Sequence, residues 1–230
     1  MSVGTVAAER AEERRLVGHG RTASDAGKLL TVEEFLALCE RPEYADTQLE
    51  LDEGRLVVMP PPSPLHGGIV WAIGALFAEY TRRMGKGVGS TESGILLGGE
   101  PPAIRRPDFA FYRDKLHLND LADEVTTELP DLVVEVLSPS DRLGMVMRKV
   151  QQYLRAGIAM VWVVDGESRN VTVYRTGREP RVLEENEVLD GEDVLPGFTC
   201  AVSELFRLPG AVMGTTAASV AGEATKGGQR

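Results

Sequence analysis

Two segments of the chain carry apolar residues at the spacing of an amphipathic helix. Between residues 65–84 the apolar positions recur every three or four residues. The same period returns over residues 141–156, and Gly157 follows as the expected C-terminal stop. A shorter helix is predicted after Thr31, because Thr31 and Glu34 have the spacing of a capping box in front of an apolar run.

Runs of β-branched and aromatic residues predict the strands. They cover residues 88–97, 106–112, 131–137, 158–164, 171–174 and 181–183, and a hairpin is predicted over 49–59 with its turn at 52–54. The run at 131–137 is almost wholly apolar, which is typical of a central strand covered on both faces. A last helical turn is expected at 203–206. The order helix, three strands, helix, strand predicts a mixed α/β sheet flanked by helices, with antiparallel additions at both ends.

Composition favours one globular domain between two polar ends. The 230 residues are 43% hydrophobic, which supplies one core and is thin for two. Residues 1–28 and 211–230 hold few large apolar side chains, so we expect disordered tails around a single domain spanning 29–210. The longest apolar window, 67–78, is too short to cross a bilayer, and the amino terminus lacks a signal-peptide pattern. These features predict a cytoplasmic protein.

The charge balance argues against broad, non-specific adhesion to nucleic acid. The formal net charge is −10, and removing the two slightly basic ends leaves −12 for residues 29–210. Phosphate binding depends on clustered Lys and Arg, although an acidic body still allows a local basic groove. The basic clusters at 82–86, 105–106 and 142–155 are typical of a solvated surface. Acidic residues concentrate in 179–193, which leaves open an interaction protein that binds a basic partner there.

Two acidic residues lie in apolar strand segments, where burying a charge costs free energy. Asp108 opens the apolar strand at 109–111, and Glu135 interrupts the predicted central strand. A carboxylate in such a place must be hydrogen-bonded, paired or bound to a metal. If the two lie on neighbouring strands at similar height, they form an oxygen-rich site suited to Mg²⁺ or Mn²⁺. The alternative is a Glu135 paired with a structural arginine or with backbone amides.

Two further positions are open to a structural or a chemical interpretation. Glu50 lies between Leu49 and Leu51 in the predicted hairpin, either in a similar buried setting or on the solvent face of a half-buried strand. Lys149 borders the apolar stripe of the second long helix and shares a helix face with Tyr153, four residues on. Taken alone, Lys149 would be an ordinary surface lysine. No serine-hydrolase, phosphate-loop or zinc-protease motif offers a rival site.

Four motifs of the chain carry a family resemblance. They read LELDEGRLVVMPPPSPLH at 49–66, RRPDFAFYRD at 105–114, PDLVVEVLSPSDR at 130–142 and KVQQYLRAGIAMVWVVD at 149–165. Together they resemble the Uma2 family of endonucleases within the PD-(D/E)xK superfamily, over about residues 30–207. The resemblance implies a restriction-endonuclease-like core of helix, three strands, helix and strand, the same order that the periodicity predicts.

The resemblance also implies roles for four residues. Asp108 corresponds to the Asp of the PD motif, and Glu135 corresponds to the acid of the E-x-K motif. Leu137 stands where that motif carries its lysine, and Lys149 of the next helix stands in the place from which the family supplies it. A long flexible side chain can reach one point from two backbones, which makes this migration physically tolerable.

The activity implied is Mg²⁺- or Mn²⁺-dependent hydrolysis of DNA. The predicted metal ligands are Asp108, Glu135 and the upstream acid Glu50, and all three join Lys149 as catalytic candidates. His66 matches a frequent family position and is given a supporting role, as is Tyr153. Because superfamily nucleases that cut duplexes often act in pairs, and because apolar, edge-forming segments follow residue 164, we expect a homodimer. A catalytically silent nuclease-like binding or regulatory module is the alternative.

Overall fold

A computed structural model describes residues 29–121, 125–139 and 141–207. Both predicted tails, 1–28 and 211–230, lie outside the described residues, and so do the last three residues of the predicted domain. The boundaries of that domain therefore stay a prediction. Within the described ranges, none of the helices combines the length and the hydropathy needed to cross a membrane.

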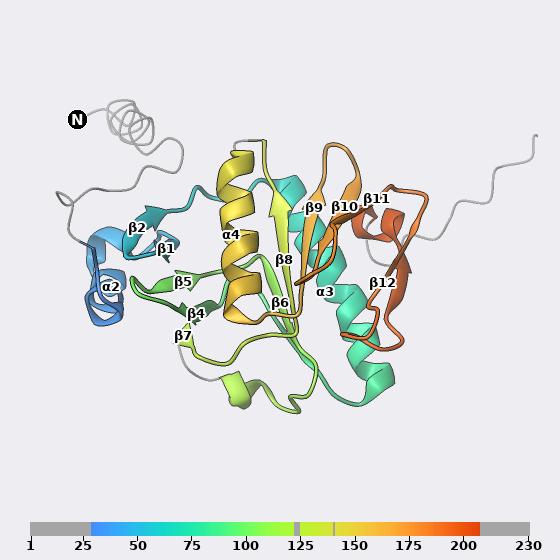
Figure 1. Cartoon of the computed structure of the whole chain (residues 1–230), viewed down its shortest axis with the longest axis horizontal. Helices are drawn as coiled ribbons and strands as arrows, with labels where there is room; N and C mark the ends of the chain where they lie inside the picture. Colours follow the sequence, from blue (N-terminus) through green and yellow to red (C-terminus); the bar gives the residue numbers. More distant parts are fainter. Residues whose placement is uncertain (1–28, 122–124, 140, 208–230) are drawn as a thin grey trace, which may run out of the picture.

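The largest sheet has six strands in the order β11-β10-β9-β8-β6-β3 (Figure 1). In chain order these strands are β3 (Val88–Ser90), β6 (Phe109–Tyr112), β8 (Leu132–Leu137), β9 (Met160–Asp165), β10 (Asn170–Tyr174) and β11 (Arg181–Leu183). The pair β8 and β9 is parallel, and the other pairs are antiparallel. The apolar run at 131–137 is confirmed as a central strand, because β8 lies between β6 and β9.

Two long helices cover the two faces of this sheet. The helix α3 (Pro64–Met84) packs against β6 and β8 through an aromatic cluster around Phe77. The helix α4 (Leu143–Ala156) lies on the opposite face, where Val146, Val150 and Tyr153 pack on β8 and β9 (Figure 1). Both predicted helices are confirmed, and α4 ends at Gly157 in a left-handed conformation with φ 107°.

A second sheet of five strands lies beside the first, in the order β2-β1-β5-β4-β7 (Figure 1). Its strands are β1 (Leu49–Asp52), β2 (Arg55–Val58), β4 (Gly94–Gly98), β5 (Ala103–Arg105) and β7 (Val125–Thr126). The predicted hairpin is β1 and β2, whose turn places Glu53 and Gly54 at positive φ. The helix α2 (Val32–Cys39) packs on this sheet and begins at the predicted capping box of Thr31 and Glu34.

Smaller elements complete the described chain. The strands β12 (Val188–Asp190) and β13 (Thr199–Ala201) form a separate two-stranded sheet. Three short 3₁₀ helices are η1 (Pro42–Tyr44), η2 (Leu118–Leu121) and η3 (Val202–Phe206). The last helical turn predicted at 203–206 is therefore a 3₁₀ helix.

Two strand predictions were wrong in extent. The run at 88–97 forms two strands in different sheets, β3 and β4, because the polar stretch between them turns the chain at Glu92, which has φ 53°. The run at 106–112 begins only at Phe109. Arg106 and Pro107 lie between β5 and β6, so this segment also passes from one sheet to the other. Both crossings bring the second sheet next to α4.

Candidate active site

The pleat of the six-stranded sheet turns two carboxylates toward α4. In β8, Val134 belongs to the apolar cluster under α3, while Val133 belongs to the cluster under α4. Since side chains alternate along a strand, Glu135 shares the α4 face with Val133. The antiparallel register pairs Phe109 with Val134, which places Asp108, the residue just before β6, opposite Glu135. The two acids are therefore at similar height, as the metal-site hypothesis requires.

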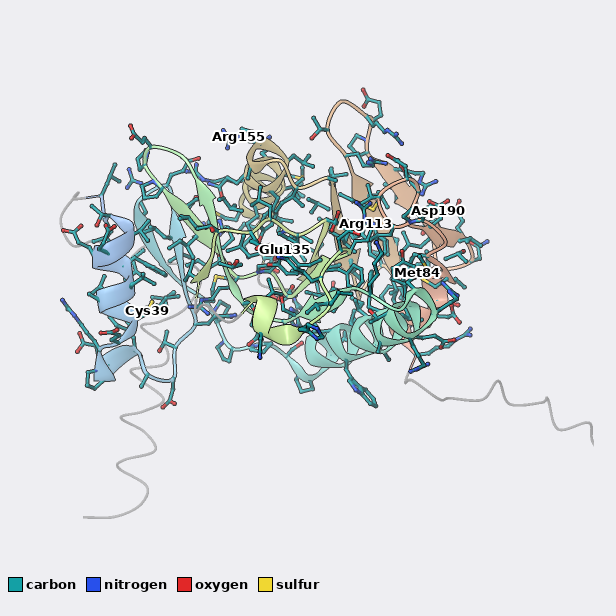
Figure 2. All side chains as sticks on the ribbon, turned by 90° about the horizontal axis from the view of Figure 1, so that it is seen from below. Cys39, Met84, Arg113, Glu135, Arg155 and Asp190 are labelled. Atoms are coloured by element: carbon teal, nitrogen blue, oxygen red, sulfur yellow. The ribbon has the colours of Figure 1, made fainter. Side chains whose placement is uncertain are left out.

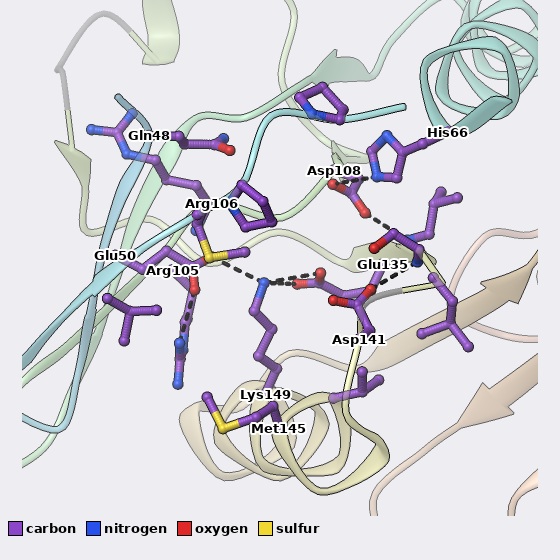
Figure 3. Close-up of a pocket in the computed structure, with 18 of the residues that line it drawn as sticks. Gln48, Glu50, His66, Arg105, Arg106, Asp108, Glu135, Asp141, Met145 and Lys149 are labelled. Carbon is purple, nitrogen blue, oxygen red and sulfur yellow. Dashed lines mark hydrogen bonds and ion pairs between the residues drawn. The ribbon is translucent and has the colours of Figure 1, made fainter. Parts of the chain in front are cut away.

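A pocket of about 190 Å³ opens over these acids (Figure 3). Its lining includes five of the predicted site residues: Glu50, His66, Asp108, Glu135 and Lys149. The sixth, Tyr153, is buried and donates a hydrogen bond from its hydroxyl to Glu135 Oε1 at 2.5 Å. Figure 2 shows Glu135 near the middle of the molecule, whereas Met84, Arg155 and Asp190 lie toward its edges. Residues from two strands, two helices and the segment just before β6 thus meet at one recessed place.

Lys149 reaches from α4 to two carboxylates. Its Nζ lies 3.1 Å from Glu135 Oε2 and 3.0 Å from Glu50 Oε1. Tyr153 follows Lys149 by four residues and therefore lies on the same face of α4. The side chains of Lys149 and Tyr153 both contact Glu135. Figure 3 shows the contact of Lys149. The interpretation of Lys149 as an ordinary surface lysine is wrong, because its side chain is only 13% exposed.

Glu50 is held by cations on both of its oxygens. Its Oε2 accepts a hydrogen bond from Arg105 Nη1 at 2.8 Å, and its Oε1 accepts one from the Arg106 amide at 3.1 Å in addition to the Lys149 contact. Glu50 is fully buried, so the solvent-face alternative is wrong. Arg105 is buried as well, which corrects its interpretation as part of a solvated basic cluster. The structural arginine considered for Glu135 contacts Glu50 instead.

A wider polar network joins β1 to α4, and the sequence reasoning missed it. Arg105 donates to Asp52 at 2.6 Å and to Gln152 at 2.8 Å, and Gln152 in turn donates to Asp52 at 2.8 Å. Arg148 contacts Asp52 and Glu53. The spacing of these residues was the available signal. Glu50 and Asp52 are two residues apart and therefore share a strand face. Gln152 follows Lys149 by three residues and Arg148 by four, so these polar residues share a helix face.

His66 and a backbone amide fix Asp108 on the far side of the pocket. His66 Nε2 lies 3.1 Å from Asp108 Oδ1, and Asp108 Oδ2 accepts a hydrogen bond from the Val136 amide at 2.5 Å (Figure 3). Asp141 also lines the pocket and accepts from the Ser138 amide at 2.8 Å. Sequence reasoning did not single out Asp141, although it is the first residue of the predicted helix that carries Lys149; the observed helix begins at Leu143.

The site separates the pKa values of its two glutamates. Burial raises the pKa of Glu135 to about 7, with Asp108 and Glu50 adding to the rise and Lys149 opposing it. Burial would also raise the pKa of Glu50, but Lys149 and Arg105 outweigh it, so that pKa is lowered. Environments that drive apart the pKa values of neighbouring acids are characteristic of sites with acid–base or metal chemistry.

The pKa values of the two cationic side chains, Lys149 and His66, and of the Tyr153 hydroxyl are all raised. Burial would lower the pKa of Lys149, but Glu135 and Glu50 together raise it. The hydrogen bond with Asp108 raises the pKa of His66. Burial raises the pKa of Tyr153 well above its ordinary value, so its hydroxyl keeps the proton that it donates to Glu135. The lysine is thus a fixed positive charge at neutral pH.

The donor chemistry of Asp108 and Glu135 fits a divalent ion of the magnesium type. Among the described residues, His, Cys, Asp and Glu form no cluster of three or more arranged to hold a metal. Magnesium commonly takes one or two protein carboxylates and completes its shell with water and substrate phosphate, so two facing acids suffice. Glu50 already accepts hydrogen bonds on both oxygens, and its predicted role as a third ligand stays a prediction.

A mixed sheet flanked by helices, with Asp108, Glu135 and a helix lysine in one pocket, is the arrangement of a nuclease-like fold. The chain belongs to the Uma2 family, described as "Putative restriction endonuclease", which matches residues 32–203. It is also similar to the crystal structure of a putative nuclease belonging to DUF820 from Anabaena variabilis ATCC 29413, with a TM-score of 0.65. That match has 20% sequence identity and covers 77% of this chain and 97% of the other, so it shows the shared fold. No curated protein matches the chain.

Proposed function

We propose that this chain is a metal-dependent endonuclease that hydrolyses phosphodiester bonds of DNA. The observation that carries the proposal is the register of β6 and β8, which sets Asp108 opposite Glu135 with Lys149 Nζ 3.1 Å from the glutamate. Membership of the Uma2 family supports a nuclease. The metal, the DNA substrate and the roles of individual residues are the proposed part.

Asp108 and Glu135 would hold Mg²⁺ or Mn²⁺, with Glu50 as the further predicted ligand. When bound, such an ion acidifies a water molecule and neutralises charge on the phosphate. Lys149 carries a positive charge at the same place, where it orients the attacking water or stabilises the negative charge that develops on phosphate oxygens. Because its amine is already fixed by two carboxylates, little reorganisation is needed during the reaction.

The surrounding residues position these groups. Arg105 and the Arg106 amide fix Glu50, and Glu50 in turn fixes Lys149. Tyr153 orients Glu135 by its hydroxyl, and His66 orients Asp108. The contacts of Glu50 favour this positioning role over direct metal binding.

A homodimer in the cytoplasm completes the proposal. The segments after residue 164 include the edge strand β11, and Val182 in this strand and Val188 nearby are more than half exposed. Exposed apolar side chains at a sheet edge favour self-association. Light scattering at micromolar concentration should give twice the mass of the chain, and a monomeric mass would remove the dimer from the proposal.

A catalytically silent nuclease-like module is the second candidate. The observation that favours it is the pairing of Lys149 with Glu135 and Glu50, which satisfies the buried charges without any ion. An interaction protein that uses the acidic stretch 179–193 has less support. Four of the seven acids of that stretch are paired within the chain, through Arg169 to Glu185, Arg175 to Glu192 and Asp193, Arg178 to Glu192, and Arg181 to Asp190.

Metal binding and cleavage measured side by side test the proposal. We expect Mg²⁺ or Mn²⁺ to raise the melting temperature by several degrees and to support cleavage of DNA. Asp108→Asn should abolish both effects, because it removes one of two facing carboxylates. Glu167→Gln, an exposed acid outside the pocket, is the matched control and should change neither. A metal-induced shift that survives in Asp108→Asn contradicts the site, and a wild-type protein that binds metal without cutting supports the silent module.

A further inference from the structure

The reacting groups lie at the bottom of the pocket, out of reach of a flat surface. The exposed fractions of the side chains are 9% for Glu135, 11% for His66, 13% for Lys149 and 18% for Asp108. A phosphate that meets these groups must enter the pocket. A duplex can bring a phosphate to such a pocket, but its bases stay stacked and paired, so no base enters a site of about 190 Å³ beside that phosphate without local unpairing.

The wall above these groups is apolar. Pro60, Pro61 and Pro62, which connect β2 to α3, line one part of the pocket. Met145 from the first turn of α4 lines another and is 39% exposed. Proline rings are rigid, and a thioether makes favourable contacts with aromatic rings, so this wall offers a surface for the face of a nucleobase. A sugar–phosphate backbone would gain nothing from it.

Few cations surround the entrance. Arg106 and Arg142 line the pocket together with the acids Glu92 and Asp141. The Arg106 guanidinium already donates to the carbonyls of Leu49 and Glu92. The Arg142 side chain is exposed, and no described residue forms an ion pair with it. Duplex binding depends on many phosphate contacts, whereas one free arginine suits a short stretch of strand.

From this pairing of a recessed charged floor with an apolar wall, we propose that the pocket takes an unpaired nucleotide. The base lies against the prolines and Met145, the backbone phosphate reaches the divalent ion that Asp108 and Glu135 would hold, and Arg142 contacts a neighbouring phosphate. The inference rests on the proposed function and narrows its substrate to single-stranded or locally unpaired nucleic acid. Single strands meet the requirement directly, because no base pair has to be opened.

Binding of labelled DNA oligonucleotides to the Lys149→Met chain, measured by fluorescence anisotropy with Mg²⁺ present, tests the inference. We expect the single strand to bind at least about tenfold more tightly than the blunt duplex of the same sequence. Met145→Ser should weaken single-strand binding about three- to tenfold and leave duplex binding unchanged. Leu143→Ser is the matched control: Leu143 lies on the same turn, is 74% exposed and does not line the pocket. Arg142→Gln should lower the salt slope of single-strand binding by about 1.

The outcomes separate this inference from the proposed function. A wild-type chain that cuts duplex as well as single strand overturns the inference and leaves the nuclease in place. Equal effects of Met145→Ser and Leu143→Ser also overturn it. Single-strand binding that depends on Met145, without cleavage of any DNA at any metal concentration, supports the unpaired-nucleotide site and overturns only the proposed endonuclease.

Discussion

The two faces of the six-stranded sheet differ in polarity: aromatic and aliphatic side chains pack the α3 face, whereas buried charged residues lie beside the apolar cluster of the α4 face. On the α3 face the ring of Phe77 lies 4.7 Å from that of Phe111 and 4.6 Å from that of Phe198, measured between centroids. On the α4 face Glu135 meets Lys149 beneath an open pocket. The strand β8 belongs to both faces and alternates between them from one residue to the next.

This difference separates stability from chemistry within one sheet. Aromatic burial on the α3 face contributes stability that is independent of pH and nearly independent of salt. A buried ionic network contributes little net stability, because the desolvation of its charges offsets their attraction. Five charged residues beneath α4 are joined by ion pairs: Glu50, Asp52, Arg105, Glu135 and Lys149. Because such a network adds little stability, its presence favours a chemical role over a purely structural one.

The largest expected effect is the loss of activity in Glu135→Gln. The substitution keeps the volume of the side chain and removes the charge, so we expect hydrolysis to fall at least about a thousandfold. The apo protein should melt at the same temperature or higher, because the change removes a buried charge that Asp108 and Glu50 repel. Lys149 keeps its contact with Glu50 in the variant. Thermal unfolding and a metal-dependent cleavage assay on the same preparation measure both effects.

The opposite outcome would place Glu135 among the structural charges. If Glu135→Gln costs on the order of 3 to 5 kcal/mol and cleavage continues as before, its ion pair holds the fold and the nuclease assignment of the site fails. The structure argues against that result, since the buried arginine of the network contacts Glu50 and Asp52 and does not contact Glu135.

Phe77→Ala should show the reverse pattern on the α3 face. Phe77 is 2% exposed and lies against five other aromatic rings, so its truncation should cost about 3 to 5 kcal/mol of unfolding free energy. Cleavage per folded molecule at low temperature should stay within about twofold, since none of the aromatic residues that lie against this ring lines the pocket. Phe206→Ala, at the partly buried edge of the same cluster, is the control and should cost less.

Periodicity predicted the two long helices and the central strand because it records local packing. Acids inside apolar runs pointed to Asp108 and Glu135, and the resemblance to a family supplied the role of Lys149, which taken alone would have been an ordinary surface lysine. The contact of Glu50 with Arg105 was not predictable, because it joins strands of a sheet whose order depends on non-local pairing. The division of residues 88–97 between two sheets was not predictable for the same reason.

Stability measured as a function of pH should distinguish the two faces further, because the buried acids with shifted pKa values lie on the α4 side. The pKa of Glu135 is about 7 in the fold against 4.5 for the free side chain, so its contribution to stability is present below pH 4.5 and is lost as the pH rises through 7. The raised pKa of His66 likewise makes the folded protein less stable as the pH rises above 6.5. The lowered pKa values of Glu50 and Asp52 act in the opposite sense, but only below about pH 4.5, where these groups titrate in the unfolded chain.

Between pH 5 and 7.5 the apo protein should therefore lose stability, by at most about 3 kcal/mol. Denaturant unfolding at several pH values measures the slope, and Glu135→Gln should flatten it to the part that His66 contributes. Saturating Mg²⁺ should flatten it as well, because an ion on the carboxylate excludes the proton. Phe77→Ala should lower the whole curve without changing its slope, since no titratable group on the α3 face is lost. A slope that survives in Glu135→Gln, or that disappears in Phe77→Ala, would show that the two faces do not divide stability and ionisation between them.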